Sequence, residues 1–197
     1  MITGIDAITY STDRWDEARQ FMNDWGLNEL AFSSTVQCFE TLSGAQVIVR
    51  RPDDASLAPA MEAGPTLREV VWGVDSEADL DLIEKSLPSP LKHCGNSYEI
   101  NSNLGALSDS SGLPAIARTV ATLDPHGLRI VFQRSRQRPT QVLGAVTNPY
   151  GNVQRINSPS PVYERATPIE IGHVVLFTDQ LHKAVSFYEN LGFVLSD

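Results

Sequence analysis

One stretch of this sequence occurs three times in altered form. Residues 5–13 read IDAITYSTD, and residues 171–179 read IGHVVLFTD. The alignment of these two copies continues without a gap through the residues that follow, and a third copy, LREVVWGVD, lies between them at 67–75. Self-similarity of this kind is the signature of a repeated supersecondary unit. The chain is therefore predicted to be built from copies of one unit.

Each copy is predicted to begin with a strand and continue into a helix. The opening segments are rich in Ile, Val, Tyr and Phe, as strands are, and Asp13 and Asp179 stand where a helix N-cap is expected. Apolar residues then recur at helical spacing, and Gly26 and Gly192 stand where a helix C-cap needs left-handed geometry. In the first copy further strands are predicted at 30–32, 36–41 and 45–49, which makes the unit βαβββ.

The later copies set the domain boundaries. The second copy is predicted to have a helix at 77–87, an insertion rich in Ser, Asn and Gly at 95–112, and strands at 116–122 and 128–132. Residues 1–136 are thus predicted to form one domain of two paired units, 1–53 and 67–136. Residues 137–168, rich in proline and without periodicity, are predicted to be a linker. Residues 169–197 are the first half of a third unit.

Composition excludes several classes of partner. The chain has 197 residues and a net charge of -9, from 15 Lys and Arg against 24 Asp and Glu. An acidic chain repels phosphate backbones, so nucleic acid is not an expected partner. No apolar run approaches the roughly 20 residues that span a bilayer, so no membrane is expected. The first residues lack the features of a secretory signal, and the two cysteines form no disulfide framework. A cytoplasmic location is expected.

Two motifs carry a resemblance to a known family. The third copy reads I-G-H-V-V-L-F-T-D and continues through F-Y-E-N-L-G-F, and Asp124-Pro125-His126-Gly127 precedes the last strand of the second copy. These lines resemble the vicinal oxygen chelate superfamily, which contains glyoxalase I, bleomycin-resistance proteins and extradiol dioxygenases. His126 departs from the Asp or Asn of the family's turn. The resemblance implies an α+β fold in which tandem βαβββ units form a cupped mixed sheet, here with the third unit truncated.

The resemblance also implies a divalent metal held by residues of the first and last strands of the units. The first-strand position corresponds to Ala7, Glu69 and His173 in the three copies, and the last-strand position to Ile48 and Val131. Imidazole and carboxylate ligands suit Fe(II), the first expectation, or Mn(II) or Zn(II). In the first two copies only Glu69 could bind a metal. The paired units are therefore expected to be metal-free, with His173 as the candidate first ligand of a catalytic half.

Structural roles are alternative interpretations for both His173 and Glu69. A lone histidine among apolar residues is often a hydrogen-bonded core residue. Glu69, the weaker candidate, could instead pair with a nearby arginine such as Arg68 or Arg118. His126, in a tight turn, is expected to be solvated, and His182 is expected to face outward without a role. The adjacent His93 and Cys94 are not expected to act together, because neighbours on an extended chain point to opposite sides.

The leading functional hypothesis is the N-terminal portion of a metalloenzyme that resembles extradiol ring-cleaving dioxygenases and acts on an aromatic diol. One alternative is a glyoxalase-type isomerase or lyase of the same superfamily. Another is a non-catalytic protein that binds a small aromatic or apolar ligand in the metal-free cup, as bleomycin-resistance proteins do. Residues 169–197 are expected to pack on the first domain or to be exchanged between chains, and a homo-oligomer is expected. The helix residues Trp15, Phe21, Met22 and Trp25 are predicted to be core.

Overall fold

The computed structural model describes residues 1–87, 118–140, 151 and 164–196. Its elements in chain order are β1 (Ile2–Ser11), α1 (Trp15–Asp24), β2 (Asn28–Phe32), β3 (Val36–Glu40), β4 (Gln46–Arg50), β5 (Thr66–Val74), α2 (Glu77–Ser86), β6 (Thr119–Leu123), β7 (Arg129–Arg134) and α4 (Leu181–Asn190). The first unit has the predicted order of one strand, one helix and three strands. The second begins in the same way and ends with β6 and β7. The insertion at 95–112 lies outside the described residues.

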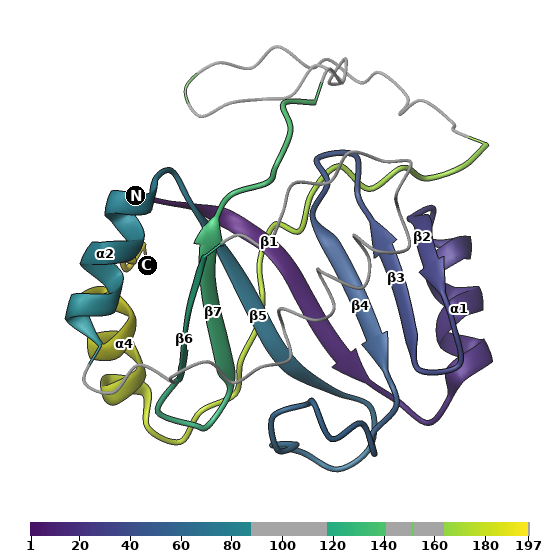
Figure 1. Cartoon of the computed structure of the whole chain (residues 1–197), viewed down its shortest axis with the longest axis horizontal. Helices are drawn as coiled ribbons and strands as arrows, with labels where there is room; N and C mark the ends of the chain where they lie inside the picture. The colour runs from purple at the N-terminus through teal and green to yellow at the C-terminus, as the bar shows by residue number, and fades with distance from the viewer. Residues whose placement is uncertain (88–117, 141–150, 152–163, 197) are drawn as a thin grey trace.

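The strands form one mixed sheet of seven, in the order β2-β3-β4-β1-β5-β7-β6 (Figure 1). The first strands of the two units, β1 and β5, are antiparallel neighbours at its centre, and each has the last strand of its own unit, β4 or β7, as a parallel neighbour. The two units are thus related by an approximate two-fold arrangement around the β1–β5 pair. The α+β class with paired units is confirmed.

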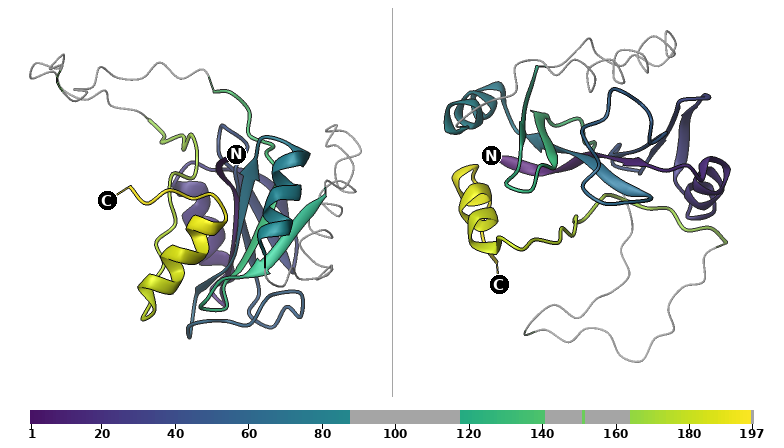
Figure 2. Two further views of the ribbon diagram at one scale, coloured as in Figure 1. Left: turned by 90° about the vertical axis from the view of Figure 1, so that its left-hand side faces the viewer. Right: turned by 90° about the horizontal axis from the view of Figure 1, so that it is seen from below.

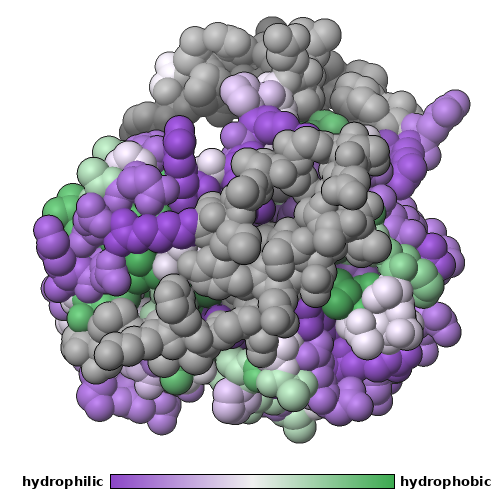
Figure 3. Space-filling view, viewed as in Figure 1, coloured by the Kyte–Doolittle hydropathy of each residue, from purple (hydrophilic) through white to green (hydrophobic). Residues whose placement is uncertain are grey.

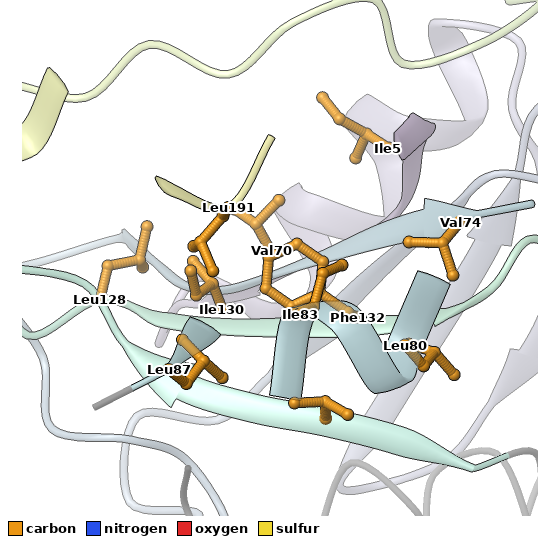
Figure 4. Close-up of a cluster of buried hydrophobic side chains, with 11 residues drawn as sticks. Ile5, Val70, Val74, Leu80, Ile83, Leu87, Leu128, Ile130, Phe132 and Leu191 are labelled. Carbon is orange, nitrogen blue, oxygen red and sulfur yellow. The ribbon is translucent and has the colours of Figure 1, made fainter. Parts of the chain in front are cut away.

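Successive residues of each strand belong to opposite faces of this sheet, because their side chains point to opposite sides. Val70, Ile130 and Phe132 belong to a core that also includes Leu80 and Ile83 of α2 (Figure 4). Further along the same face, Trp15 of α1 packs with other buried residues, namely Leu27, Phe39, Val47 and Val49. We call this the helix face.

The opposite face carries a separate apolar cluster. It contains Ala7, Cys38, Ile48, Val71, Ala121 and Val131. Val71 and Val131 directly follow Val70 and Ile130 along their strands, so they point away from the helix face. Among the described residues, no helix contributes to this cluster. We call it the cup face, because it is the face on which the predicted metal positions lie.

The helix ends confirm the glycine prediction and correct the capping prediction. Gly26 and Gly192 have φ angles of +94° and +93°, which an L side chain rarely adopts. Neither Asp13 nor Asp179 caps its helix: the N-cap residues of α1 and α4 are Arg14 and Gln180. Neither helix has a side-chain hydrogen bond at its N-cap; the threonine hydroxyls bond the N-cap residues themselves. Thr12 Oγ1 and Thr178 Oγ1 accept hydrogen bonds from the backbone N–H groups of Arg14 and Gln180.

The third copy agrees with its prediction in the helix and differs in the strand. Helix α4 forms as predicted, but residues 169–178 have no assigned strand. A strand is defined by ladder hydrogen bonds to a neighbour. Over the described residues this segment has only isolated bonds, such as those from Leu42 N to Pro168 O (3.0 Å) and from Ser43 N to Ile169 O (2.8 Å).

The third copy packs on the first domain, as one of the two expected arrangements. Leu191 is buried in the core of the helix face, and Ile171, Phe187, Tyr188 and Phe193 pack against that core. The two turned views show α4 and the segment before it on one side of the sheet (Figure 2). The third unit therefore supplies part of the core of the helix face.

The surface corrects one part of the core prediction. Trp15 is buried and Met22 packs against the core, but the side chains of Phe21 and Trp25 are exposed at 55% and 57%. In the view of Figure 1, hydrophilic residues dominate the described surface, with apolar residues in separate patches (Figure 3). Across the described ranges, no helix has the length and apolar character that a membrane span needs.

Candidate functional site

The positions transferred from the metal-binding family converge on the cup face. Two rows of strand partners run across the sheet: Ile48, Thr9, Glu69 and Arg129 form one row, and Gln46, Ala7, Val71 and Val131 form the next. Ala7, Ile48 and Val131 belong to one buried cluster. The aligned positions thus share one face of the sheet, on neighbouring rows. These three side chains are hydrocarbon and cannot coordinate a metal.

Glu69, at the fourth of these positions, forms an ion pair with an arginine. Its Oε2 lies 3.1 Å from Nε of Arg129, the neighbour of Glu69 in the strand register. Both side chains are buried, with exposed fractions of 8% and 7%. The ion-pair interpretation of Glu69 is thus supported, although the partner is neither Arg68 nor Arg118. The sequence could not identify it, because the two strands become neighbours only through the crossover of the second unit.

The two arginines named from the sequence have other partners. Arg68 donates from Nη1 to Ser11 Oγ at 3.0 Å and from Nε to the carbonyl of Ala58 at 2.8 Å. Burial lowers the pKa of its guanidinium. Arg118 is a surface residue that donates to Asp81 and Glu84 of α2 at 2.5 Å each. Arg68 fastens the loop after β4 to the sheet, and Arg118 joins the start of β6 to α2.

The donor set of the cup does not fit a divalent metal. The row that contains Glu69 also contains Thr9, whose buried Oγ1 has no hydrogen-bond partner among the described residues. A neutral hydroxyl is a weak ligand, and a catalytic site of this kind needs two imidazoles and a carboxylate, or a similar set. Over the part of the chain that the structure describes, no group of three His, Cys, Asp or Glu residues could hold a metal ion.

His173 lies elsewhere, in the segment that precedes α4. It is exposed, as are Val175 and Phe177 on the same side of the segment, with exposed fractions of 68% and 85% for the latter two. Val174 and Leu176 alternate with them and pack against the core of the helix face. His173 is therefore not a core histidine. It lines a groove together with residues of the first domain, Ile8 and Tyr10 among them.

A groove adjoins His173 on the helix face. It has a volume of about 800 Å³ and is lined mainly by apolar side chains of α1, of the sheet and of residues 168–173, with Phe21, Met22, Trp25, Val47 and Ile171 among them. The backbone bonds of Pro168 and Ile169 hold one wall in place. A volume of this size is in the range of small-molecule sites. The groove lies on the opposite face of the sheet from the predicted cup.

A polar cluster that sequence reasoning missed joins the third copy to the second. Asp124 is buried and accepts bonds from the backbone N–H groups of His126 and Leu128, and from the hydroxyl of Tyr188 at 3.1 Å. His126 Nε2 is hydrogen-bonded to Thr178 Oγ1, so this histidine is not solvated as expected. Burial and the neighbouring carboxylate raise the pKa of Tyr188 well above its usual value.

Among the described residues, neither His182 nor Cys38 belongs to a candidate site. His182 is exposed on α4, as expected. His93 and Cys94 lie outside the described residues. Cys38 is buried within the cup-face cluster, where desolvation raises its pKa to about 12, so it remains a thiol and is not a nucleophile.

Neither a comparison with protein-family models nor one with curated protein sequences gives a match. Solved structures do match. The Mn(II)-bound glyoxalase from Novosphingobium aromaticivorans is 16% identical with a TM-score of 0.62, and the match covers 99% of this chain and 54% of that one. A halotolerant catechol dioxygenase is 15% identical with a TM-score of 0.57, and the shares are 98% and 56%.

A third match is homoprotocatechuate 2,3-dioxygenase from Arthrobacter globiformis, at 15% identity and a TM-score of 0.55, covering 99% of this chain and 51% of that one. The fold is therefore that of the glyoxalase and extradiol dioxygenase structures, the vicinal oxygen chelate fold. At these identities the likeness establishes the fold alone. The chain spans about half the length of these proteins.

Proposed function

We propose that this chain is the N-terminal portion of a metal-dependent, extradiol-type ring-cleaving dioxygenase that acts on an aromatic diol. In this proposal the paired units 1–136 are a metal-free supporting half, and His173 is the first metal ligand of a catalytic half. The remaining ligands would come from sequence outside this chain. Fe(II) is the first expectation for the metal, with Mn(II) and Zn(II) as alternatives.

One observation carries this proposal: the same position of the unit has a different fate in different copies. In the first two copies it is Ala7, which is packed in an apolar cluster, and Glu69, which is paired with Arg129. In the third copy it is His173, which is exposed. This difference supports a division in which the described cup carries no metal and the exposed imidazole meets further ligands.

The experiment compares a protein that contains this chain together with any sequence that follows it, and its His173→Ala variant. Both are reconstituted with Fe(II) under anaerobic conditions, and then tested for O₂ uptake with a catechol. We expect stoichiometric iron and catechol-dependent O₂ uptake that are both lost in His173→Ala. Full iron content in the variant would contradict the role of His173, and iron without O₂ uptake would contradict the dioxygenase reaction.

A glyoxalase-type isomerase or lyase is the second candidate, favoured by the match to the Mn(II)-bound glyoxalase. The two candidates separate in the same reconstituted protein. An isomerase consumes no O₂ and loads with Mn(II), and it converts a hemithioacetal instead of a catechol.

A binding protein is the third candidate, and the groove beside α1 favours it. Its exposed Phe21 and Trp25 contact each other edge to face, at 5.3 Å between ring centroids. An aromatic ligand in this groove would quench the fluorescence of Trp25, and Trp25→Leu would remove that response. Saturable quenching by catechols in the 197-residue chain without added metal would support binding without catalysis.

A further inference from the structure

The Glu69–Arg129 pair is more than a salt bridge next to an apolar cluster. Glu69 is the one position of the first cup that retains a metal-ligating side chain, and Arg129 is its direct neighbour on β7. Ala7 and Val71 are also register partners, so Ala7 is a diagonal neighbour of Glu69 on the two central strands. The guanidinium of Arg129 therefore lies close to the positions that would carry metal ligands.

We propose that the guanidinium of Arg129 stands in for the metal cation of the first cup. A buried carboxylate needs a positive partner, because an isolated charge in the interior is unstable. A metal ion supplies that charge where several ligands surround it. Here Ala7, Ile48 and Val131 supply none, so an ion would be held by one carboxylate alone. A guanidinium brings its own covalent attachment and needs no further ligands.

The burial of the pair supports this assignment. Arg129 and Glu69 are both buried, with 6% of each whole residue exposed. A plain surface ion pair would lie at the rim, as that between Arg118 and Asp81 does, with exposed fractions of 40% and 53%. Thr9, opposite Glu69 in the strand register, has a buried hydroxyl without a hydrogen-bond partner in the described part of the chain. The polar side chains of this row, Thr9, Glu69 and Arg129, thus lie on the cup face.

The first test asks whether a free cation can replace the guanidinium. Arg129→Ala is expected to lower Tm by about 10 °C, as removal of one partner of a buried pair does in a domain of this size. Methylguanidinium chloride, a free cation of the same chemistry, should then restore several degrees, compared with NaCl of equal ionic strength. In the matched control Arg129→Ala/Glu69→Gln the cation has no carboxylate to meet, and no recovery is expected.

Equal responses of the two variants to methylguanidinium, including none in either, would overturn the proposal. If Arg129→Ala is too unstable to melt, the far-UV circular dichroism signal regained on addition of methylguanidinium replaces Tm as the readout. All variants carry His173→Ala, so that the exposed imidazole cannot bind the added ion. The same chain without changes at 69 and 129 provides the baseline.

The second test restores ligands with and without the guanidinium. Ala7→His and Val131→Glu rebuild two ligand positions, and the pair is made once with Arg129 retained and once with Arg129→Ala. If the guanidinium and the metal share one place, Co(II) should bind about tenfold or more tightly in the arginine-free chain, seen in the visible spectrum of the bound ion. Equal affinities, or no binding in a folded arginine-free chain, would show that Arg129 lies outside the metal's place.

Discussion

Two regions of this molecule place equivalent positions of the repeated unit in different environments. In the cup of residues 1–136 that position is closed: Ala7 lies in an apolar cluster and Glu69 is paired with Arg129. In the third copy it is open, because His173 is exposed beside Val175 and Phe177. The comparison teaches that a repeated unit keeps its backbone plan while the chemistry at one position changes from packing, to ion pairing, to availability for a ligand.

The largest loss of stability is expected from substitution of Arg129 in the cup. Arg129→Leu leaves the carboxylate of Glu69 buried without its partner, and we expect a loss of about 3–5 kcal/mol in the free energy of unfolding. Glu69→Leu/Arg129→Leu should recover most of it, since an apolar pair of similar volume is often as stable as an ion pair. Urea denaturation of the three chains measures this. If the double variant is no more stable than Arg129→Leu, the loss does not come from an unpaired Glu69 carboxylate, and the prediction is wrong.

The next largest loss of stability is expected from a buried residue of the third copy. Leu191, at the end of α4, is buried with an exposed fraction of 5% in the core of the helix face. Leu191→Ala should cost about 2–5 kcal/mol, the range for a leucine truncated in a core. The matched control is Leu195→Ala, whose side chain is 61% exposed. Thermal melts of both compare them, and equal effects would mean that the third copy is not part of the core.

A smaller effect is expected at the polar contact between the copies. Tyr188→Phe removes the hydroxyl that donates to Asp124, and it should cost about 1 kcal/mol, the typical value of one hydrogen bond. Because the pKa of Tyr188 is raised, the phenol is protonated at neutral pH, and the loss should not vary with pH there. Trp72 packs edge to face on Phe193, so its fluorescence reports the undocking of the third copy. A loss that disappears as pH rises would contradict this assignment.

The smallest effect is expected at His173 itself. His173→Ala in the 197-residue chain should change stability by less than about 0.5 kcal/mol, as exposed substitutions do. A thermal melt of the two chains suffices. A loss comparable with that of Leu191→Ala would show that the imidazole is a structural residue and would remove the basis for its proposed role as a ligand.

The repeat in the sequence predicted the fold well, for a physical reason. Strand and helix patterns in each copy follow from periodicity, which is local, and the positive φ angles of Gly26 and Gly192 follow from a residue type that tolerates them. The same local reasoning misplaced the helix caps by one residue, since the N-cap residues are Arg14 and Gln180 rather than Asp13 and Asp179. The exact start of a helix depends on backbone geometry, which residue type alone does not determine.

The site was predicted less completely, because its partners are distant in the sequence. Glu69 was named as a candidate and as a member of an ion pair, but Arg129 became its partner only when β7 crossed over to lie beside β5. Asp124 and Tyr188 are likewise far apart in the chain and meet only because α4 docks on the second unit. The departure of His126 from the family's turn was a signal in the sequence, because this histidine bonds Thr178 of the third copy.

The sequence by itself determined that this chain is built from a repeated unit, that its first two copies lack metal ligands at three of four positions, and that its third copy retains a histidine. Those properties belong to residue types and their order. Only the tertiary structure decided which face each side chain reaches, that the third copy packs against the core of the first domain, and that a guanidinium neutralises Glu69. Burial and pairing depend on which strands and helices become neighbours, and the β1–β5 pairing at the centre of the sheet sets that for both units.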